Sequence, residues 1–145
     1  MTSQSETNGI VHSLFIKTEH GAPMQPTSTI DAVAEKGLRG DQSYGRRSRQ
    51  VLLVDLEQLR SLKLHPGDLR ENITVSGLKL DSLPIGSQLR SGEVVLEIVD
   101  VCDPCSKLED IRPGLMKASE NMRGMLAIVK HSGTIRPGEP ITLLG

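Results

Sequence analysis

Residues 93–101 read EVVLEIVDV, the longest stretch of alternating side chains in the chain. Because successive side chains of a strand point to opposite faces, this stretch predicts a β-strand. The two faces carry Val94, Leu96 and Ile98, and Val95, Glu97 and Val99. Both sets are mostly apolar, so we expect the middle of this strand to be buried on both sides.

Short apolar runs of the same kind recur between glycine and proline residues. We expect strands at residues 10–16, 49–54, 72–75, 124–129 and 141–144. Helix signals are fewer: Asp55 is a favourable N-cap for a short helix with Leu56, Leu59 and Leu62 on one face. Many short strands with few helices predict a mainly β protein, a closed or curled β-barrel with a few short helices. No strand–helix alternation persists, which disfavours a parallel α/β fold.

Length and composition limit the class of protein. The chain has 145 residues, enough for one domain with a real core, and its net charge is −1. With 17 basic and 18 acidic residues, one Phe, one Tyr and no Trp, nothing favours nucleic-acid or membrane partners. Residues 1–8 are polar and predict a disordered tail. The sequence has no signal-peptide core or membrane-spanning stretch, so we expect a cytoplasmic protein with reduced thiols.

The longest predicted strand runs into Cys102-Asp103-Pro104-Cys105. Asp is a favoured N-cap and Pro a favoured first helical residue, so we expect a short helix to begin at Asp103. Cys105 would then lie in the first helical turn, where unpaired backbone N–H groups stabilise a thiolate. The alternative is that both cysteines are small buried side chains.

Two other uses of this motif fit the sequence poorly. Structural zinc needs about four ligands, yet no second CxxC exists and the 4 histidines are scattered singly. A thioredoxin-like dithiol normally lies early in a βαβ pattern, whereas this motif lies late in a strand-rich chain.

Two further polar segments lie between the predicted strands. Gly37 and Gly40 allow a tight backbone path whose N–H groups suit an anion. The arginines in and after this segment have guanidinium groups that suit phosphate oxygens: Arg39, Arg46, Arg47 and Arg49. An ordinary charged loop explains the same pattern. The segment Arg70-Glu71-Asn72 precedes a strand and either forms a buried polar network or lines a pocket.

Six short motifs occur in one order along the chain. They are GLRGD (37–41), RQV (49–51), RENI (70–73), LPIG (83–86), PC (104–105) and GTIRPG (133–138). This ordered set resembles the MOSC domain family, named for the C-terminal domain of molybdenum cofactor sulfurases. The resemblance covers residues 9–145 and implies a stand-alone MOSC domain with a closed or curled barrel. Many members carry a basic residue or histidine after the Gly-Asp pair, whereas this chain has Gln42.

The resemblance also implies a site. The cysteine of its Pro-Cys motif carries sulfur or ligates molybdenum; that residue is Cys105, with Asp103 nearby. The Gly-Asp, Arg-Gln and Arg-Glu-Asn motifs imply cofactor-binding residues around the same pocket: Arg39, Gly40, Asp41, Arg49, Arg70, Glu71 and Asn72. Cys102 is an addition to the family motif. It either resolves a persulfide on Cys105 by forming a disulfide or is inert packing.

Two functions of different classes follow from the resemblance. In the first, Cys105 accepts sulfur from a cysteine desulfurase for metal–sulfur cofactor assembly, and pyridoxal phosphate acts only in that partner. In the second, Cys105 ligates the molybdenum cofactor and the protein reduces N-hydroxylated compounds. The chain holds only the minimal domain, which favours the sulfur carrier. A third interpretation is a module that only binds a sulfurtransferase or molybdoenzyme partner.

Overall fold

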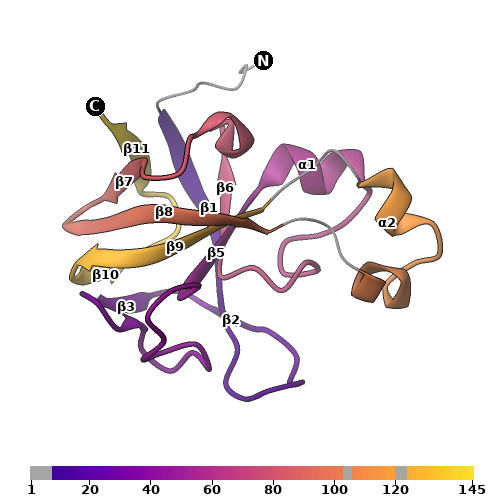
Figure 1. Cartoon of the computed structure of the whole chain (residues 1–145), viewed down its shortest axis with the longest axis horizontal. Coiled ribbons are helices and arrows are strands. Elements are labelled where there is room, and N and C mark those ends of the chain that lie inside the picture. Colours follow the sequence, from indigo (N-terminus) through magenta and orange to yellow (C-terminus); the bar gives the residue numbers. More distant parts are fainter. Residues whose placement is uncertain (1–7, 103–105, 120–123) are drawn as a thin grey trace.

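The computed structural model describes residues 8–102, 106–119 and 124–145, in which strands dominate (Figure 1). The strands are β1 (Asn8–Ile16), β2 (Gln25–Thr27), β3 (Ile30–Val33), β4 (Gly37–Leu38), β5 (Val51–Asp55), β6 (Ile73–Ser76), β7 (Gln88–Ser91), β8 (Val94–Cys102), β9 (Gly124–His131), β10 (Gly133–Ile135) and β11 (Pro140–Leu144). The helices are α1 (Leu56–Ser61), α2 (Leu115–Ala118) and the 3-10 helices η1 (Leu80–Ser82) and η2 (Ser106–Asp110). Every helix in this part of the chain is too short or too polar to cross a lipid bilayer. Of the expected disordered tail, Asn8 belongs to β1, and residues 1–7 lie outside the described residues.

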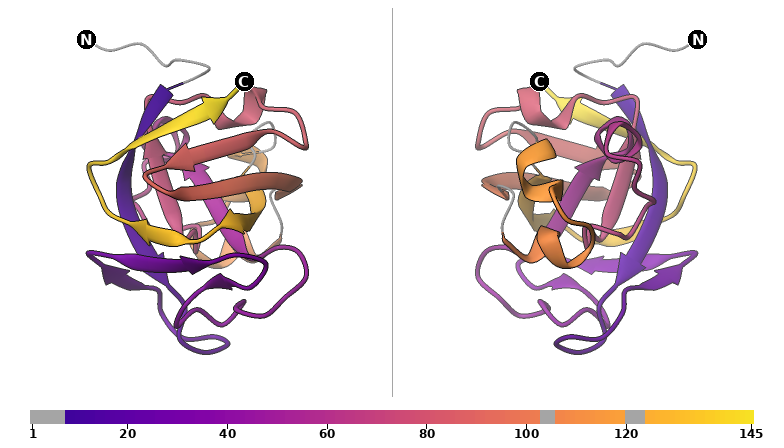
Figure 2. Two further views of the ribbon diagram at one scale, coloured as in Figure 1. Left: turned by 90° about the vertical axis from the view of Figure 1, so that its left-hand side faces the viewer. Right: turned by 90° about the vertical axis from the view of Figure 1, so that its right-hand side faces the viewer.

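Seven of the described strands form a closed ring in the order β11-β7-β8-β9-β5-β6-β1. β1 closes the ring by pairing with β11, where Gly9 lies opposite Ile141. β2 pairs with the far end of β1, and β10, β3 and β4 form a separate sheet. Figure 2 shows the strands curving around a common axis. The prediction of a mainly β protein with a closed barrel is confirmed.

The longest alternating stretch forms β8, one wall of the barrel. Val94, Leu96 and Ile98 are buried in the core, as the alternation predicts. The opposite face, with Val95 and Val99, is only half-buried, because alternate side chains of a barrel strand point outward. The expectation that both faces are buried is therefore wrong.

One parallel pair interrupts the antiparallel ladder pattern. β5 and β6 are parallel neighbours, and α1 lies between them in the chain. The Asp55 Oδ1 atom accepts a hydrogen bond of 2.8 Å from the Glu57 backbone N–H, which confirms the predicted N-cap. Leu56, Leu59 and Leu62 are all buried, so the predicted apolar face of this helix is also confirmed.

A second hydrophobic cluster lies outside the barrel core and joins η2 and α2 to α1. Leu115 belongs to this cluster together with Leu59 and Leu62, and Leu108 packs against it. Figure 2 (right) shows η2 and α2 on the same side of the barrel. The Arg112 guanidinium also donates a hydrogen bond of 2.8 Å to the Leu62 carbonyl oxygen. These contacts anchor the chain that follows the cysteine motif.

Candidate functional site

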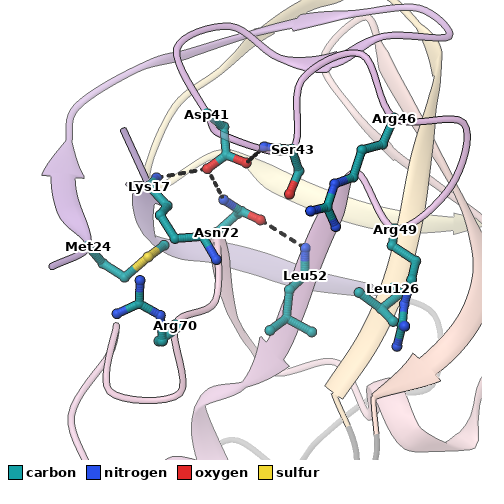
Figure 3. A pocket seen from close by; sticks show the side chains of 10 residues that line it. All are labelled: Lys17, Met24, Asp41, Ser43, Arg46, Arg49, Leu52, Arg70, Asn72 and Leu126. Carbon is teal, nitrogen blue, oxygen red and sulfur yellow. Dashed lines mark hydrogen bonds between the residues drawn. The ribbon is translucent and has the colours of Figure 1, made fainter. Parts of the chain in front are cut away.

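A cavity of about 190 Å³ opens where β5 and β9 run side by side (Figure 3). Its apolar floor consists of Leu52 and Leu126, which are ladder partners. Their neighbours Val51, Leu53 and Met125 belong to the barrel core, so alternation turns Leu52 and Leu126 outward. The other described lining residues come from loops and strand ends that converge on this floor: Lys17, Met24, Asp41, Ser43, Arg46, Arg49, Arg70 and Asn72.

Positive charge dominates the cavity. Lys17 and Arg70 lie on one side of the floor, and Arg46 and Arg49 lie on the other (Figure 3). The one acidic residue among the described lining residues is Asp41, of which only 6% is exposed. The cavity therefore suits an anion, and guanidinium groups are particularly suited to phosphate oxygens.

Asp41 ties the loops of the site together. Its Oδ1 atom accepts hydrogen bonds from the Lys17 backbone N–H (2.7 Å) and from Asn72 Nδ2 (3.0 Å). Its Oδ2 atom accepts one from the Ser43 backbone N–H (3.0 Å). Three donors thus compensate the buried carboxylate, and the loop after β4 is fastened to the end of β1.

Asn72 extends this network to two strands. Its Nδ2 group also donates to the Phe15 carbonyl oxygen (3.2 Å), and its Oδ1 atom accepts from the Leu52 backbone N–H (3.0 Å). Phe15 and Leu52 belong to β1 and β5, so one amide side chain joins both strands to the start of β6. Asn72 and Asp41 therefore direct their polar atoms into the scaffold of the cavity.

Gln50 has the same role for the arginine-rich loop. Its buried side chain donates from Nε2 to the carbonyl oxygens of Arg46 (2.6 Å) and Glu35 (3.2 Å). Its Oε1 atom accepts a hydrogen bond of 2.9 Å from the Val129 backbone N–H. These bonds fix the backbone from which Arg46 and Arg49 extend into the cavity.

The predicted cofactor-binding residues divide into two groups in the described structure. Four of them line the cavity: Asp41, Arg49, Arg70 and Asn72. The others, Arg39, Gly40 and Glu71, are not among its described lining residues. Arg39 is exposed, Gly40 makes a turn with φ 84°, and Glu71 is fully buried.

The predicted catalytic and metal-binding residue, Cys105, lies outside the described residues, as does Asp103. The predicted helix start at Asp103 therefore lies outside the described residues as well, and the described chain resumes with the 3-10 helix η2, which begins at Ser106. Within the described ranges, no group of three or more His, Cys, Asp and Glu side chains is arranged to hold a metal ion.

Cys102 lies on the same barrel wall as the cavity. It is the last residue of β8 and pairs with Gly124 of β9. Two residues earlier, Asp100 pairs with Leu126 of the cavity floor. Paired residues share one face of a sheet, so Cys102 is on the cavity face, about 7 Å along the strand from Asp100.

Several cavity residues are absent from the predicted site: Lys17, Met24, Ser43, Arg46, Leu52 and Leu126. Of these, Arg46 has a local signal, as one of the arginines near the Gly-Asp motif. Leu52 has a weaker one, since alternation from the Arg-Gln motif turns it away from the core. The remaining four come from separate segments and share no pattern.

Comparison with known proteins agrees with this architecture. A model of the MOSC domain matches residues 20–142 of the chain. The crystal structure of the YuaD protein from Bacillus subtilis has a TM-score of 0.77 and 20% sequence identity, covering 94% of this chain and 95% of that chain.

Two further crystal structures are similar. YiiM from Geobacillus stearothermophilus has a TM-score of 0.67 at 19% identity, covering 98% of this chain and 75% of that chain. YiiM from Escherichia coli has a TM-score of 0.65 at 20% identity, covering 97% and 70%. At these identities the structural similarity establishes the fold alone. No functionally curated protein matches the chain by sequence.

Proposed function

Because this chain belongs to the MOSC domain family, we propose that it is a sulfur carrier for metal–sulfur cofactor assembly, with Cys105 as the carrying thiolate. The observation that supports this proposal most is the convergence of four basic side chains on a cavity at the face that carries Cys102. Cys105 follows three residues later in the sequence. Because three residues span at most about 11 Å, we place the acceptor anion of the proposed transfer in this cavity.

The cavity residues fit the phosphate group of the molybdenum cofactor. Lys17, Arg46, Arg49 and Arg70 supply the cations, and the carboxylate of Asp41 is compensated by its own hydrogen bonds. The volume of about 190 Å³ lies below the roughly 300–1,000 Å³ of sites that enclose a whole small molecule. These features favour transient binding of the acceptor by its phosphate over full enclosure.

The transfer step is a thiol–disulfide type of exchange. The Cys105 thiolate attacks the outer sulfur of a persulfide on a cysteine desulfurase, whose sulfur–sulfur bond breaks as its own thiolate leaves. Cys105 then carries a persulfide, and pyridoxal phosphate stays in the partner. Release of the outer sulfur to the acceptor as sulfide needs two electrons, which an external dithiol supplies by becoming a disulfide.

Intact mass spectrometry tests the carrier. After incubation with a cysteine desulfurase and cysteine, we expect the wild-type protein to gain one sulfur atom. Cys105→Ala should remove this gain without unfolding the protein, while the matched variant Cys102→Ala should retain most of it. A sulfur adduct that persists in Cys105→Ala would contradict the assignment. Equal losses in both variants would instead indicate a dithiol mechanism.

The second candidate is a molybdenum-cofactor reductase of N-hydroxylated compounds, which the same basic cavity favours. The four cations would hold the phosphate of a resident cofactor, and Cys105 would be the protein ligand of the metal. When bound, that group would supply two-electron redox chemistry. Elemental analysis of protein from a host that makes the cofactor separates the candidates. Near-stoichiometric molybdenum that disappears in Cys105→Ala would favour the reductase, and the absence of both metal and sulfur adduct would favour a binding module.

A further inference from the structure

We propose that Glu71 is a positioning residue that aims Arg70 at the anion cavity. The identity of the anion that Arg70 binds rests on the proposed function. The positioning role of Glu71 rests on the geometry of the loop. Glu71 is not among the described lining residues, and its side chain is fully buried. Its effect on the cavity is therefore indirect, and the hydrogen bonds of its carboxylate point to the loop that ends at Arg70.

The Glu71 carboxylate bonds to this loop through one oxygen. Its Oε2 atom accepts hydrogen bonds from the Gly67 backbone N–H (2.9 Å) and from Thr74 Oγ1 (2.7 Å). Its Oε1 atom has no hydrogen-bond partner among the described residues. Burying a carboxylate with one unpaired oxygen costs free energy. This cost indicates that the two hydrogen bonds to the other oxygen have a structural role. Thr74 lies within β6, so the bond to Gly67 is the one that reaches the loop.

Gly67 begins the turn that carries Arg70. The Arg70 backbone N–H donates a hydrogen bond of 2.9 Å to the Gly67 carbonyl oxygen, which closes the turn, and the Glu71 carboxylate holds the Gly67 end of it. Arg70 has φ 62°, a left-handed conformation that is unfavourable for a residue with a side chain. Such strain persists only where the surroundings hold it. In this conformation Arg70 lines the cavity and donates from Nη2 to the Ala22 carbonyl oxygen (2.7 Å).

Arg49, on the opposite side of the cavity, is built in the same way. It has φ 55° and directly precedes Gln50, a buried side chain with three hydrogen bonds to the backbone. Arg49-Gln50 leads into β5 and Arg70-Glu71 leads toward β6, and these strands are parallel neighbours. Two left-handed arginines, each followed by a buried polar anchor, thus flank one cavity, which indicates a common positioning device.

A double-mutant cycle tests the role of Glu71. Titration with inorganic phosphate measures affinity for wild type, Arg70→Ala, Glu71→Met and the double variant. We expect Arg70→Ala to weaken binding about tenfold and Glu71→Met about threefold to tenfold. The double variant should bind no worse than Arg70→Ala alone, because Glu71 acts through Arg70. Glu71→Gln keeps an acceptor oxygen for Gly67 and should retain the wild-type affinity.

Amide hydrogen exchange at Gly67 and Arg70 reports on the loop without any ligand, and Glu71→Met should reduce protection at both. The matched control is Thr74→Val, which removes the other hydrogen bond to the same carboxylate oxygen. It should lower stability while leaving phosphate affinity and the exchange at Gly67 and Arg70 unchanged. If Glu71→Met does not fold, the variant that combines Glu71→Met with Thr74→Val replaces it in both measurements. This variant also removes the Thr74 hydroxyl, which would otherwise lose its acceptor.

Unchanged exchange at Gly67 and Arg70 in Glu71→Met would overturn the positioning role. Affinity losses that multiply in the double variant would overturn it as well. A wild-type protein that binds no phosphate would overturn the proposed anion site instead. The exchange data would then decide the role of Glu71 by themselves.

Discussion

At the residue scale, hydrogen-bonding side chains and cationic side chains have different tasks in the cavity. Asp41 and Asn72 direct their polar atoms at backbone groups and at each other. Arg46 and Arg49 instead extend guanidinium groups from an exposed loop into the cavity (Figure 3). Charge-assisted hydrogen bonds are stronger than neutral ones, so each of these arginines should contribute measurable affinity for an anion.

Arg46→Ala and Arg49→Ala are each expected to weaken phosphate binding about tenfold, the loss of one charge-assisted hydrogen bond. Arg47→Ala is the matched control, because Arg47 is exposed and is not among the described lining residues. It removes the same charge, yet we expect less than about a twofold change, since salt screens charges away from the site. Calorimetric titration at constant ionic strength measures all three. Equal losses would indicate diffuse surface charge instead of a defined site.

At the element scale, one carboxylate joins η2 to α2. Glu109 accepts hydrogen bonds from the backbone N–H groups of Met116 (2.9 Å) and Gly114 (3.0 Å), at the start of α2. These bonds, with that from Met116 the largest cause, hold the pKa of Glu109 below its ordinary value of 4.5. An ionised side chain therefore stabilises the two short helices that follow the cysteine motif.

The pH dependence of this contact has a definite sign. Because the folded-state pKa of Glu109 is lowered, its contribution is present above the ordinary value of 4.5 and is lost as pH falls through the lowered value. The amide chemical shifts of Gly114 and Met116 should change together in that acidic window. Glu109→Gln keeps an acceptor oxygen but removes the titration, so its shifts should stay constant. If the wild-type amide shifts of Gly114 and Met116 stay constant as the pH falls far below 4.5, the prediction is wrong.

At the scale of the whole molecule, β1 is the strand that closes the barrel. It pairs with β6 on one side and with β11 on the other. A Cβ atom added to Gly9 would lie 2.7 Å from Leu78 Cβ and 2.8 Å from the Ser76 carbonyl oxygen. The second of these is a backbone atom of β6, so the strands themselves must move apart to admit a methyl group.

Gly9→Ala is therefore expected to lower the free energy of unfolding by about 1–3 kcal/mol, the usual cost of overpacking. Gly145→Ala is the matched control, since nothing lies within 4 Å of the added Cβ atom. Urea unfolding measures both variants, and the control should have the wild-type midpoint. Equal midpoints for Gly9→Ala and wild type would mean that β1 adjusts without opening the ring.

The closed barrel also explains which elements could be predicted locally. β1, β5, β6, β8, β9 and β11 lie within two residues of the predicted ranges at each end, because their apolar runs carry the strand signal themselves. The local pattern does not predict β3 or β7, which have four residues each and include polar side chains. β7 is held between β8, which directly follows it in the chain, and β11, which is distant in sequence, so its conformation depends on these two partners.

The sequence by itself determined the mainly β class, the helix capped by Asp55 and, through six ordered motifs, the family. The family resemblance also predicted a common pocket for Asp41, Arg49, Arg70 and Asn72, which line one cavity in the structure. Only the tertiary structure decided that Asp41 and Asn72 hold the cavity while arginines and Lys17 give it its charge. The physical reason is that the direction of a side chain follows from the backbone path. At this cavity that path is set by segments from across the chain, which meet only when the barrel closes.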